Sequence, residues 1–421
     1  MKKTFYRRKD CRLCGQASFE TVFLLQPTPI ANDYMSQDDL GKDEEIYPLE
    51  VALCHNCGNV FLLDIVEPEI LYKNFKYVSS SSPGLAAHFS EYAEYILQHF
   101  PMKKGTLAVD VGSNDGLLLK EFQKRGGLSV LGVDPAREIA RKATADGIET
   151  LGQYYNLELA LEIKKKRGAA HIITSNNTMA NVDNLAEFIK SIHELLANDG
   201  IFIFETGYLF NLVQNMVFDN IYHEHLSYFS VKPLDLFFKR SGMELIDIKW
   251  VPTKGGSIRG VAQREGGPRK RSASVDQMIQ TETGFGLHQA STFQELKNRI
   301  DTEKNKLFDL LAELKKNNKR IAGYGASHSV TTFLHYFGLG DKLEFLFDDN
   351  TAKYHMLSPG YHIPVLPSQE IYKIKPDYMI ILAWRFHDMI IKKHQSYLNQ
   401  GGQFILPLPE MKVVCKEGAR V

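Results

Sequence analysis

The sequence predicts an α/β protein in which a small cysteine-bearing domain precedes two doubly wound domains. A strand, a glycine turn and the start of a helix occupy residues 108–120, and a second apolar strand follows at 128–135. A second alternation of strands and helices begins at residue 320, which is typical of a further doubly wound sheet. Paired cysteine motifs come before both. We therefore expect domains over residues 1–68, 69–265 and 275–421.

Length and charge narrow the class of protein. The 421 residues suffice for two or three domains, each with its own core. Lys plus Arg and Asp plus Glu both number 50, so no overall field favours nucleic acid or an anionic membrane. The basic start runs into Cys11 without an apolar stretch, and the longest apolar runs are too short to span a bilayer. We expect a cytoplasmic monomer or weak homodimer that binds neither nucleic acid nor membrane.

Two Cys-x-x-Cys-Gly knuckles predict a zinc site. Together they supply four thiolates, and the glycine after each lets amide groups point back at sulfur, as in many tetrahedral zinc sites. A redox pair or disulfides would be the alternative, which suits duplicated knuckles in a cytosolic chain less well. Four sulfur ligands leave no open position, so the zinc is expected to be structural. The predicted ligands are Cys11, Cys14, Cys54 and Cys57.

The next segment has two interpretations. Residues 72–84 combine aromatic side chains, among them Tyr77, with a run of serines ahead of Pro83. Such a composition is typical of a linker, but the same groups could fold over the mouth of a ligand-binding domain as a lid. A helical pattern follows at residues 85–100.

The glycine turn at 112–116 is the first candidate binding site. Glycine allows positive φ and close approach of the backbone to a ligand, and free N–H groups at the following helix attract polar or anionic groups. Asp134 ends the next strand, where an acid can accept two ribose hydroxyls. A tight turn of any α/β protein is the alternative. The predicted binding residues here are Gly112, Ser113, Asn114, Asp115, Gly116 and Asp134.

This turn lacks the G-x-G-x-x-G order of a nicotinamide site, and its D-V-G-S-N-D-G form resembles the first motif of class I methyltransferases. The resemblance implies that the loop holds the methionine part of S-adenosylmethionine and that Asp134 holds its ribose. A helix is expected at 137–145. The buried strand within 171–181 would bring Asn176 and Asn177 to the sheet edge where ligands bind.

Later elements complete this sheet. We expect a helix at 185–196 and a central strand that ends in Glu205. Strands at 244–251 and 257–263 bracket Lys254-Gly-Gly-Ser and look like the antiparallel hairpin that closes a class I methyltransferase sheet.

The densest chemistry lies at Tyr222-His-Glu-His225, with Tyr228 close behind. If the segment is helical, Tyr222, His225 and Tyr228 share a face; if it is extended, Tyr222 and Glu224 do. Either arrangement offers a histidine base with a carboxylate nearby, and histidine titrates near neutral pH. A polar surface loop is one alternative. A metal site using His223, Glu224 and His225 is another, but adjacent side chains rarely converge on one ion.

The C-terminal third predicts a second doubly wound domain. An amphipathic helix at 293–314 leads into a strand and glycine turn at 320–327. This turn lacks the third glycine of a dinucleotide site, so the signal for nicotinamide is weak; the helix start at 326–329 could instead bind a diphosphate. Further strands are expected at 343–349, 377–384 and 403–407.

The order of these parts resembles the nucleotide-sugar C-methyltransferases of deoxysugar biosynthesis over nearly the whole chain. The resemblance implies a dTDP-linked 4-keto-6-deoxyhexose as substrate, methylated on the ring carbon beside the ketone. It also implies His225 as the base, Tyr222 and Glu224 close to the sugar, and Tyr77 at the mouth of the site. The chain departs from the family at Asn181 and Lys254, where histidine is common, and in the turn at 327–330.

We therefore predict an S-adenosylmethionine-dependent C-methyltransferase with a structural zinc. His225 would take a proton from the carbon beside a ketone, Glu224 would orient the imidazole, and Tyr222 or Tyr77 would donate to the enolate. Three alternatives stay open. They are an O- or N-methyltransferase of a small molecule, a non-catalytic protein that binds S-adenosylmethionine or a nucleotide, and a redox enzyme that uses the second glycine turn.

Overall fold

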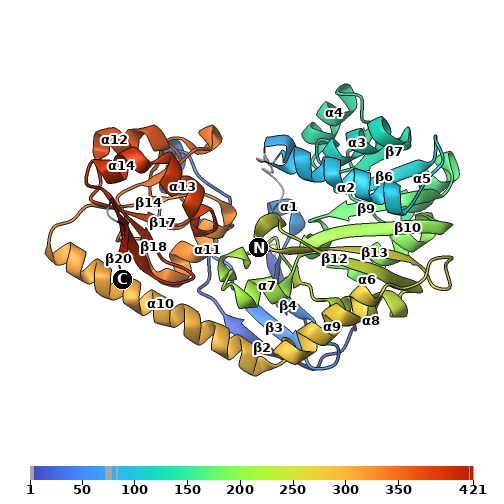
Figure 1. Ribbon diagram of the computed structural model, residues 1–421, viewed down its shortest axis with the longest axis horizontal. Coiled ribbons are helices and arrows are strands. Elements are labelled where there is room, and N and C mark those ends of the chain that lie inside the picture. Colours follow the sequence, from blue (N-terminus) through green and yellow to red (C-terminus); the bar gives the residue numbers. More distant parts are fainter. Residues whose placement is uncertain (1–3, 72–77, 82–83, 417, 421) are drawn as a thin grey trace.

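The computed structural model describes residues 4–71, 78–81, 84–416 and 418–420. Figure 1 shows two α/β parts side by side, with the blue strands of the N-terminal region below and between them. No helix in the described part of the chain is long and apolar enough to cross a membrane.

The N-terminal region is built on a small antiparallel sheet with the order β11-β4-β3-β2. Its edge strand β11 comes from the middle of the chain, because Ser227 and Tyr228 pair with Phe61 and Val60. The elements are β1 (Phe5–Arg7), β2 (Phe19–Leu24), β3 (Glu50–Cys54), β4 (Val60–Leu62), β5 (Asp64–Val66), α1 (Pro68–Leu71) and β11 (Ser227–Tyr228).

The central part holds a seven-stranded sheet with the order β12-β13-β10-β9-β6-β7-β8. The strands from β10 to β8 are parallel, and β13 and β12 add an antiparallel hairpin at one edge, as the sequence predicts. The strands are β6 (Leu107–Val111), β7 (Ser129–Val133), β8 (Thr150–Leu151), β9 (Ala170–Asn176), β10 (Leu196–Gly207), β12 (Met243–Val251) and β13 (Ser257–Arg264). The helices are α2 (Leu85–His99), α3 (Leu117–Gly126), α4 (Arg137–Ala145), α5 (Leu157–Arg167), α6 (Leu185–Leu195), α7 (Leu209–Gln214) and α8 (Val231–Arg240).

The C-terminal part holds a second seven-stranded sheet with the order β16-β15-β14-β17-β18-β19-β20. Figure 1 shows the long helix α10 running along one side of this part and α9 lying under the central part. The strands are β14 (Ile321–Tyr324), β15 (Leu346–Asp348), β16 (Val365–Pro367), β17 (Tyr378–Ile381), β18 (Gln403–Leu406), β19 (Lys412–Cys415) and β20 (Gly418–Arg420). The helices are α9 (Ala273–Phe285), α10 (Ala290–Lys316), α11 (His328–Phe337), α12 (Ile371–Ile374), α13 (His387–Lys393) and α14 (Gln395–Asn399).

The parts share apolar cores. One core joins Val51 of β3 and Phe218 of the central part to Phe333 of α11, and all three side chains are buried. Another joins the zinc-knuckle cysteines to the central sheet through Phe61 and Phe229. Chain segment 218–228 therefore lies where the N-terminal, central and C-terminal parts meet.

The predicted fold class is confirmed, and helix 137–145 has the expected bounds. Helix α9 is not predicted from the sequence. Only Val275 and Glu282 are buried among its residues, so the helix shows no apolar stripe of the kind that reveals helical periodicity.

Candidate active site and metal centre

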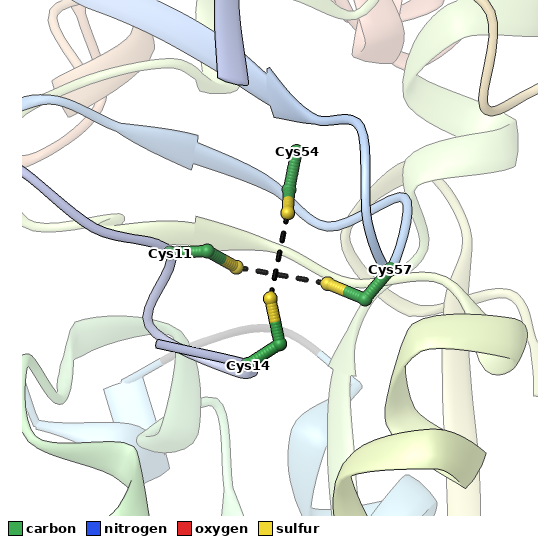
Figure 2. Close-up of side chains that lie close together, drawn as sticks. All are labelled: Cys11, Cys14, Cys54 and Cys57. Atoms are coloured by element: carbon green, nitrogen blue, oxygen red, sulfur yellow. Dashed lines mark hydrogen bonds between the residues drawn. The ribbon is translucent and has the colours of Figure 1, made fainter. Parts of the chain in front are cut away.

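The four knuckle cysteines converge on one point, as Figure 2 shows. The sulfur atoms all lie within 4.8 Å of one another. The Cys11 and Cys57 sulfurs are 3.6 Å apart and those of Cys14 and Cys54 are 3.5 Å apart. A tetrahedron with Zn–S bonds of about 2.3 Å has sulfur–sulfur edges of about 3.8 Å, so the cage fits zinc.

The surroundings of the cage also suit a structural metal. Gly15 and Gly58 have φ of +70° and +79°, and each donates its N–H to the carbonyl of the first cysteine of its knuckle. Asn59 donates its side-chain amide to the Cys11 sulfur at 3.6 Å. A hydrogen bond of this kind stabilises a thiolate and fixes its direction. Four cysteines fill a tetrahedron, which leaves no position for a substrate.

The glycine loop joins β6 to α3 as predicted and is built for close approach. Gly112 has φ of +81°, and a Cβ atom there would overlap the Thr178 hydroxyl. Only a residue without a side chain fits this position. The Ser113 hydroxyl is buried and has no hydrogen-bond partner within the described residues. A glycine cradle with an unsatisfied buried hydroxyl fits a polar ligand such as S-adenosylmethionine.

Asp134 shapes this loop. Its carboxylate accepts the backbone N–H of Asn114 at 2.8 Å and that of Ala136 at 2.9 Å. The side chain is only 6% exposed, although each oxygen keeps a further lone pair.

The predicted linker or lid meets the same loop. The backbone N–H groups of Ser79 and Ser80 donate to the side chains of Asn114 and Asp115, at 2.8 and 3.0 Å. Residues 79–81 thus lie against the glycine loop. Tyr77 falls outside the residues that the structure describes.

Asn176 ends β9 and Asn177 follows it, at the expected edge of the sheet. Asn176 pairs in register with Glu205 of β10, and the Asn177 N–H donates to the Glu205 carbonyl at 2.7 Å. The buried Glu205 carboxylate accepts from Arg259 at 2.6 Å and lies 2.7 Å from the ring nitrogen of His88 on α2. This ion pair ties the strand end to the hairpin and to the helix that covers it.

A small cavity of about 40 Å³ opens beside these strand ends. It connects Asn177 of the predicted donor site with His225, and Lys254 and Tyr228 also line it. The remaining lining residues are Ala180, Thr206, Gly207, Tyr208, Leu209, Leu212, Val217, Asn220, Ser227, Gly255 and Gly256. One cavity therefore contains residues from both halves of the predicted site.

His225 is held by two hydrogen bonds. Its Nδ1 lies 2.9 Å from the Asn220 carbonyl, which accepts only from an N–H, and its Nε2 lies 3.0 Å from the Tyr222 hydroxyl. This pattern fixes the tautomer with the proton on Nδ1 and a basic Nε2. Burial lowers the pKa of His225 to about 4, and the positive charges of Lys254 and Arg385 act in the same direction.

The expectation that Glu224 orients this imidazole is wrong, because the Asn220 carbonyl holds Nδ1. Glu224 is buried, and burial raises the pKa of its carboxyl to about 7. Its Oε1 lies 3.9 Å from Nε2 of His328 on α11, and burial lowers the pKa of that imidazole to about 3. The neighbouring His223 is also turned away from the cavity and lies 3.2 Å from the Pro48 carbonyl.

The C-terminal part adds residues that sequence reasoning missed. Arg385 lies 3.3 Å from the Lys254 carbonyl and 3.8 Å from the buried carboxylate of Asp219. The His328 ring packs 5.6 Å from that of Tyr222. Arg385 follows the end of β17, and a charged residue at the carboxyl end of a parallel strand is a usable signal.

Family models match the chain in three consecutive segments. They describe a zinc-binding domain at residues 11–72, a methyltransferase domain at 86–248 and a C-methyltransferase C-terminal domain at 252–409.

The chain is also similar to individual proteins. C-methyltransferase NovU from Streptomyces niveus is 31% identical over 409 residues, which cover 97% of each chain. A solved S-adenosylmethionine-dependent methyltransferase from Aquifex aeolicus aligns at 15% identity over 44% of this chain and 98% of its own, with a TM-score of 0.33. The magnesium protoporphyrin IX methyltransferase of Synechocystis aligns at 13% identity over 43% and 80%, also with a TM-score of 0.33. Because the likeness to NovU spans both chains almost completely, the protein is an S-adenosylmethionine-dependent methyltransferase and belongs to the C-methyltransferase family.

Proposed function

We propose that the protein methylates the ring carbon next to the ketone of a nucleotide-linked keto-deoxysugar. The observation that carries this proposal is the shared cavity, because one face holds the strand end beside the glycine loop and another holds His225. The side chain of Lys254 lines it, and Arg385 lies behind the Lys254 carbonyl. A cationic lining suits an anionic substrate such as a sugar linked to a diphosphate.

The donor would be held by the loop from Gly112 to Gly116, with Asp134 and the asparagines at 176 and 177 beside it. S-adenosylmethionine supplies an electrophilic methyl group when it is bound. Around it, the glycine backbone allows close contact and Ser113 offers a buried hydroxyl. The residues 79–81 that lie against the loop would exclude water from this side.

His225 would remove the proton from the carbon beside the ketone. Its Nε2 is unprotonated at neutral pH, because burial keeps its pKa near 4. Such a base is weak when the site is empty. A negative charge developing on the substrate next to the ring favours the imidazolium, and so raises the effective basicity during the step.

Tyr222 would act together with His225. In the structure its hydroxyl lies 3.0 Å from Nε2. This hydrogen bond must break when the substrate carbon approaches Nε2. The neutral Nδ1–H stays fixed on the Asn220 carbonyl and holds the ring direction throughout. The proton taken by Nε2 makes the imidazole cationic, and the electron pair left behind moves onto the ketone oxygen.

The test is to compare His225→Ala with the unchanged protein on a dTDP-4-keto-6-deoxyhexose. Methyl transfer should fall by about a hundredfold or more, since the base is lost, while the dissociation constant of S-adenosylhomocysteine measured by calorimetry should change less than about threefold. His99→Ala, at an exposed side chain at the end of α2, is the matched control and should retain full activity.

Two results would contradict the proposal. If His225→Ala lost donor binding and turnover together, the residue would belong to the donor site and not to the base. If the labelled methyl group were located by NMR on an oxygen or nitrogen of the product, the reaction would not be C-methylation of this carbon.

A further inference from the structure

The proposed reaction needs a donor for the enolate oxygen, and the residues first expected to provide it are engaged or outside the described chain. The Tyr222 hydroxyl is paired with His225. Tyr77 lies outside the described residues. Arg385 is positioned by the Lys254 carbonyl, by Ser329 at 3.4 Å and by Asp219 at 3.8 Å. The charge of Arg385 is thus directed at the protein and not at the cavity.

Lys254 differs from these residues because its ammonium group has no carboxylate partner in the described part of the chain. It lines the cavity that also contains His225. Within the described part of the chain, its ammonium group makes neither a hydrogen bond nor an ion pair with a carboxylate. The residue is exposed and lines the cavity, while protein atoms crowd around its ammonium group. This crowding lowers the pKa of Lys254 to about 8, and the Arg385 charge lowers it further against the opposing effect of Glu205.

The backbone at Lys254 has an uncommon conformation that its surroundings hold in place. Lys254 has φ of +52° and ψ of +29° in the turn between β12 and β13, a left-handed conformation that is rare for a residue with a side chain. Two glycines follow, and the second could not carry a Cβ because Asn211 fills that space. Arg385 of the C-terminal part donates to the Lys254 carbonyl and so restrains the conformation of this turn. Strained conformations that are held in place by their surroundings cluster at functional sites.

We propose that Lys254 is a catalytic residue whose ammonium group donates to the ketone oxygen and holds the enolate that forms when His225 takes the neighbouring proton. This inference rests on the proposed function and names one more member of its machinery. The proton moves from carbon to Nε2 of His225, the electron pair moves to the ketone oxygen, and Lys254 keeps its proton while its hydrogen bond strengthens. Tyr228, whose buried hydroxyl also lines the cavity, is the neutral alternative, but a charged donor stabilises an oxyanion more.

The experiment separates the proton step from methyl transfer. With S-adenosylhomocysteine in place of the donor, a dTDP-4-keto-6-deoxyhexose is incubated in D₂O, and loss of the proton signal beside the ketone is followed by NMR. Methyl transfer is measured in parallel for kcat and KM. The variants are Lys254→Met, which keeps the length of the side chain, and Lys254→Arg, which keeps the charge. Lys249→Met, an exposed lysine on the same hairpin, is the matched control, and thermal unfolding checks that each variant is folded.

Loss of one preorganised donor costs about a hundredfold or more in rate. We expect Lys254→Met to lower both the exchange rate and kcat about a hundredfold, with KM changed less than threefold, and Lys254→Arg to recover at least a tenth of the rate. A tenfold rise in KM with unchanged kcat and exchange would overturn the proposal and make Lys254 an anchor for the substrate's phosphates. A loss in Tyr228→Phe that Lys254→Met does not share would assign the donor to Tyr228. If the unchanged protein neither exchanged nor methylated any keto-sugar, the proposed function would fall, and this assignment with it.

Discussion

His223 should make the protein acid-sensitive, and the size of the effect can be worked out from its environment. The ring is fully buried, its Nε2 lies 3.2 Å from the Pro48 carbonyl, and its Nδ1 has no partner within the described residues. Burial lowers the pKa of His223 from 6.5 to about 4. Between these pH values the unfolded chain binds a proton that the folded chain does not, so stability is lost as pH falls from 6.5 towards 4.

The full difference corresponds to about 3 kcal/mol, of which about 2 kcal/mol is expressed at pH 5. His223→Gln keeps a donor for the Pro48 carbonyl but cannot titrate. Urea unfolding at pH 7.5 and pH 5 should therefore show that the variant loses about 2 kcal/mol less than the unchanged protein. Zinc release at low pH affects both chains and cancels in the comparison, and His55→Gln gives the baseline for an exposed histidine. Equal losses in His223→Gln and the unchanged protein would refute this reasoning.

Three further outcomes test other parts of the structure. Gly112→Ala should weaken binding of S-adenosylhomocysteine at least tenfold by calorimetry, because its Cβ would overlap Thr178 in a backbone that disfavours side chains; an unchanged affinity would place the donor elsewhere. A chelator should release one zinc per chain and lower the melting temperature, whereas quadruple Cys→Ser protein should bind none. Glu282 accepts the first backbone N–H groups of α8 from a buried position, so Glu282→Gln should cost about 1–3 kcal/mol of stability in urea, and a neutral result would show that the charge is not needed there.

The predictable elements are those that follow a local rule. The helix at 137–145 shows its apolar stripe, and the zinc cage needs only four cysteines at the right spacing. The two-residue strand β11 has no such signal, because a pair of residues cannot show alternation. It exists because Ser227 and Tyr228 find a partner in β4, far away in sequence.

The same distinction applies to the candidate site. The glycine loop and the strand ends are local features and lie where the sequence indicates. The partner of the His225 imidazole is not local in this sense: a carboxylate one residue away was the obvious choice, yet the turn at 222–225 brings Nδ1 to the Asn220 carbonyl. Arg385 and His328 approach from another part of the chain, and no pattern around residue 225 could reveal them.

The zinc-binding region contacts the chain on both sides of His225. Arg12, in the first knuckle, is fully enclosed and donates from one nitrogen to the carbonyls of Leu62 and Leu226, at 2.8 and 2.9 Å. Strand β4 pairs with β11 directly after segment 222–226, and His223 within that segment lies beside the Pro48 carbonyl. Segment 222–228 is thus held by the N-terminal region that contains the cysteine cage. His328 and Arg385 approach the site from the C-terminal part. We therefore expect that removal of the metal loosens this support and lowers the rate of methyl transfer, although the metal has no open coordination position.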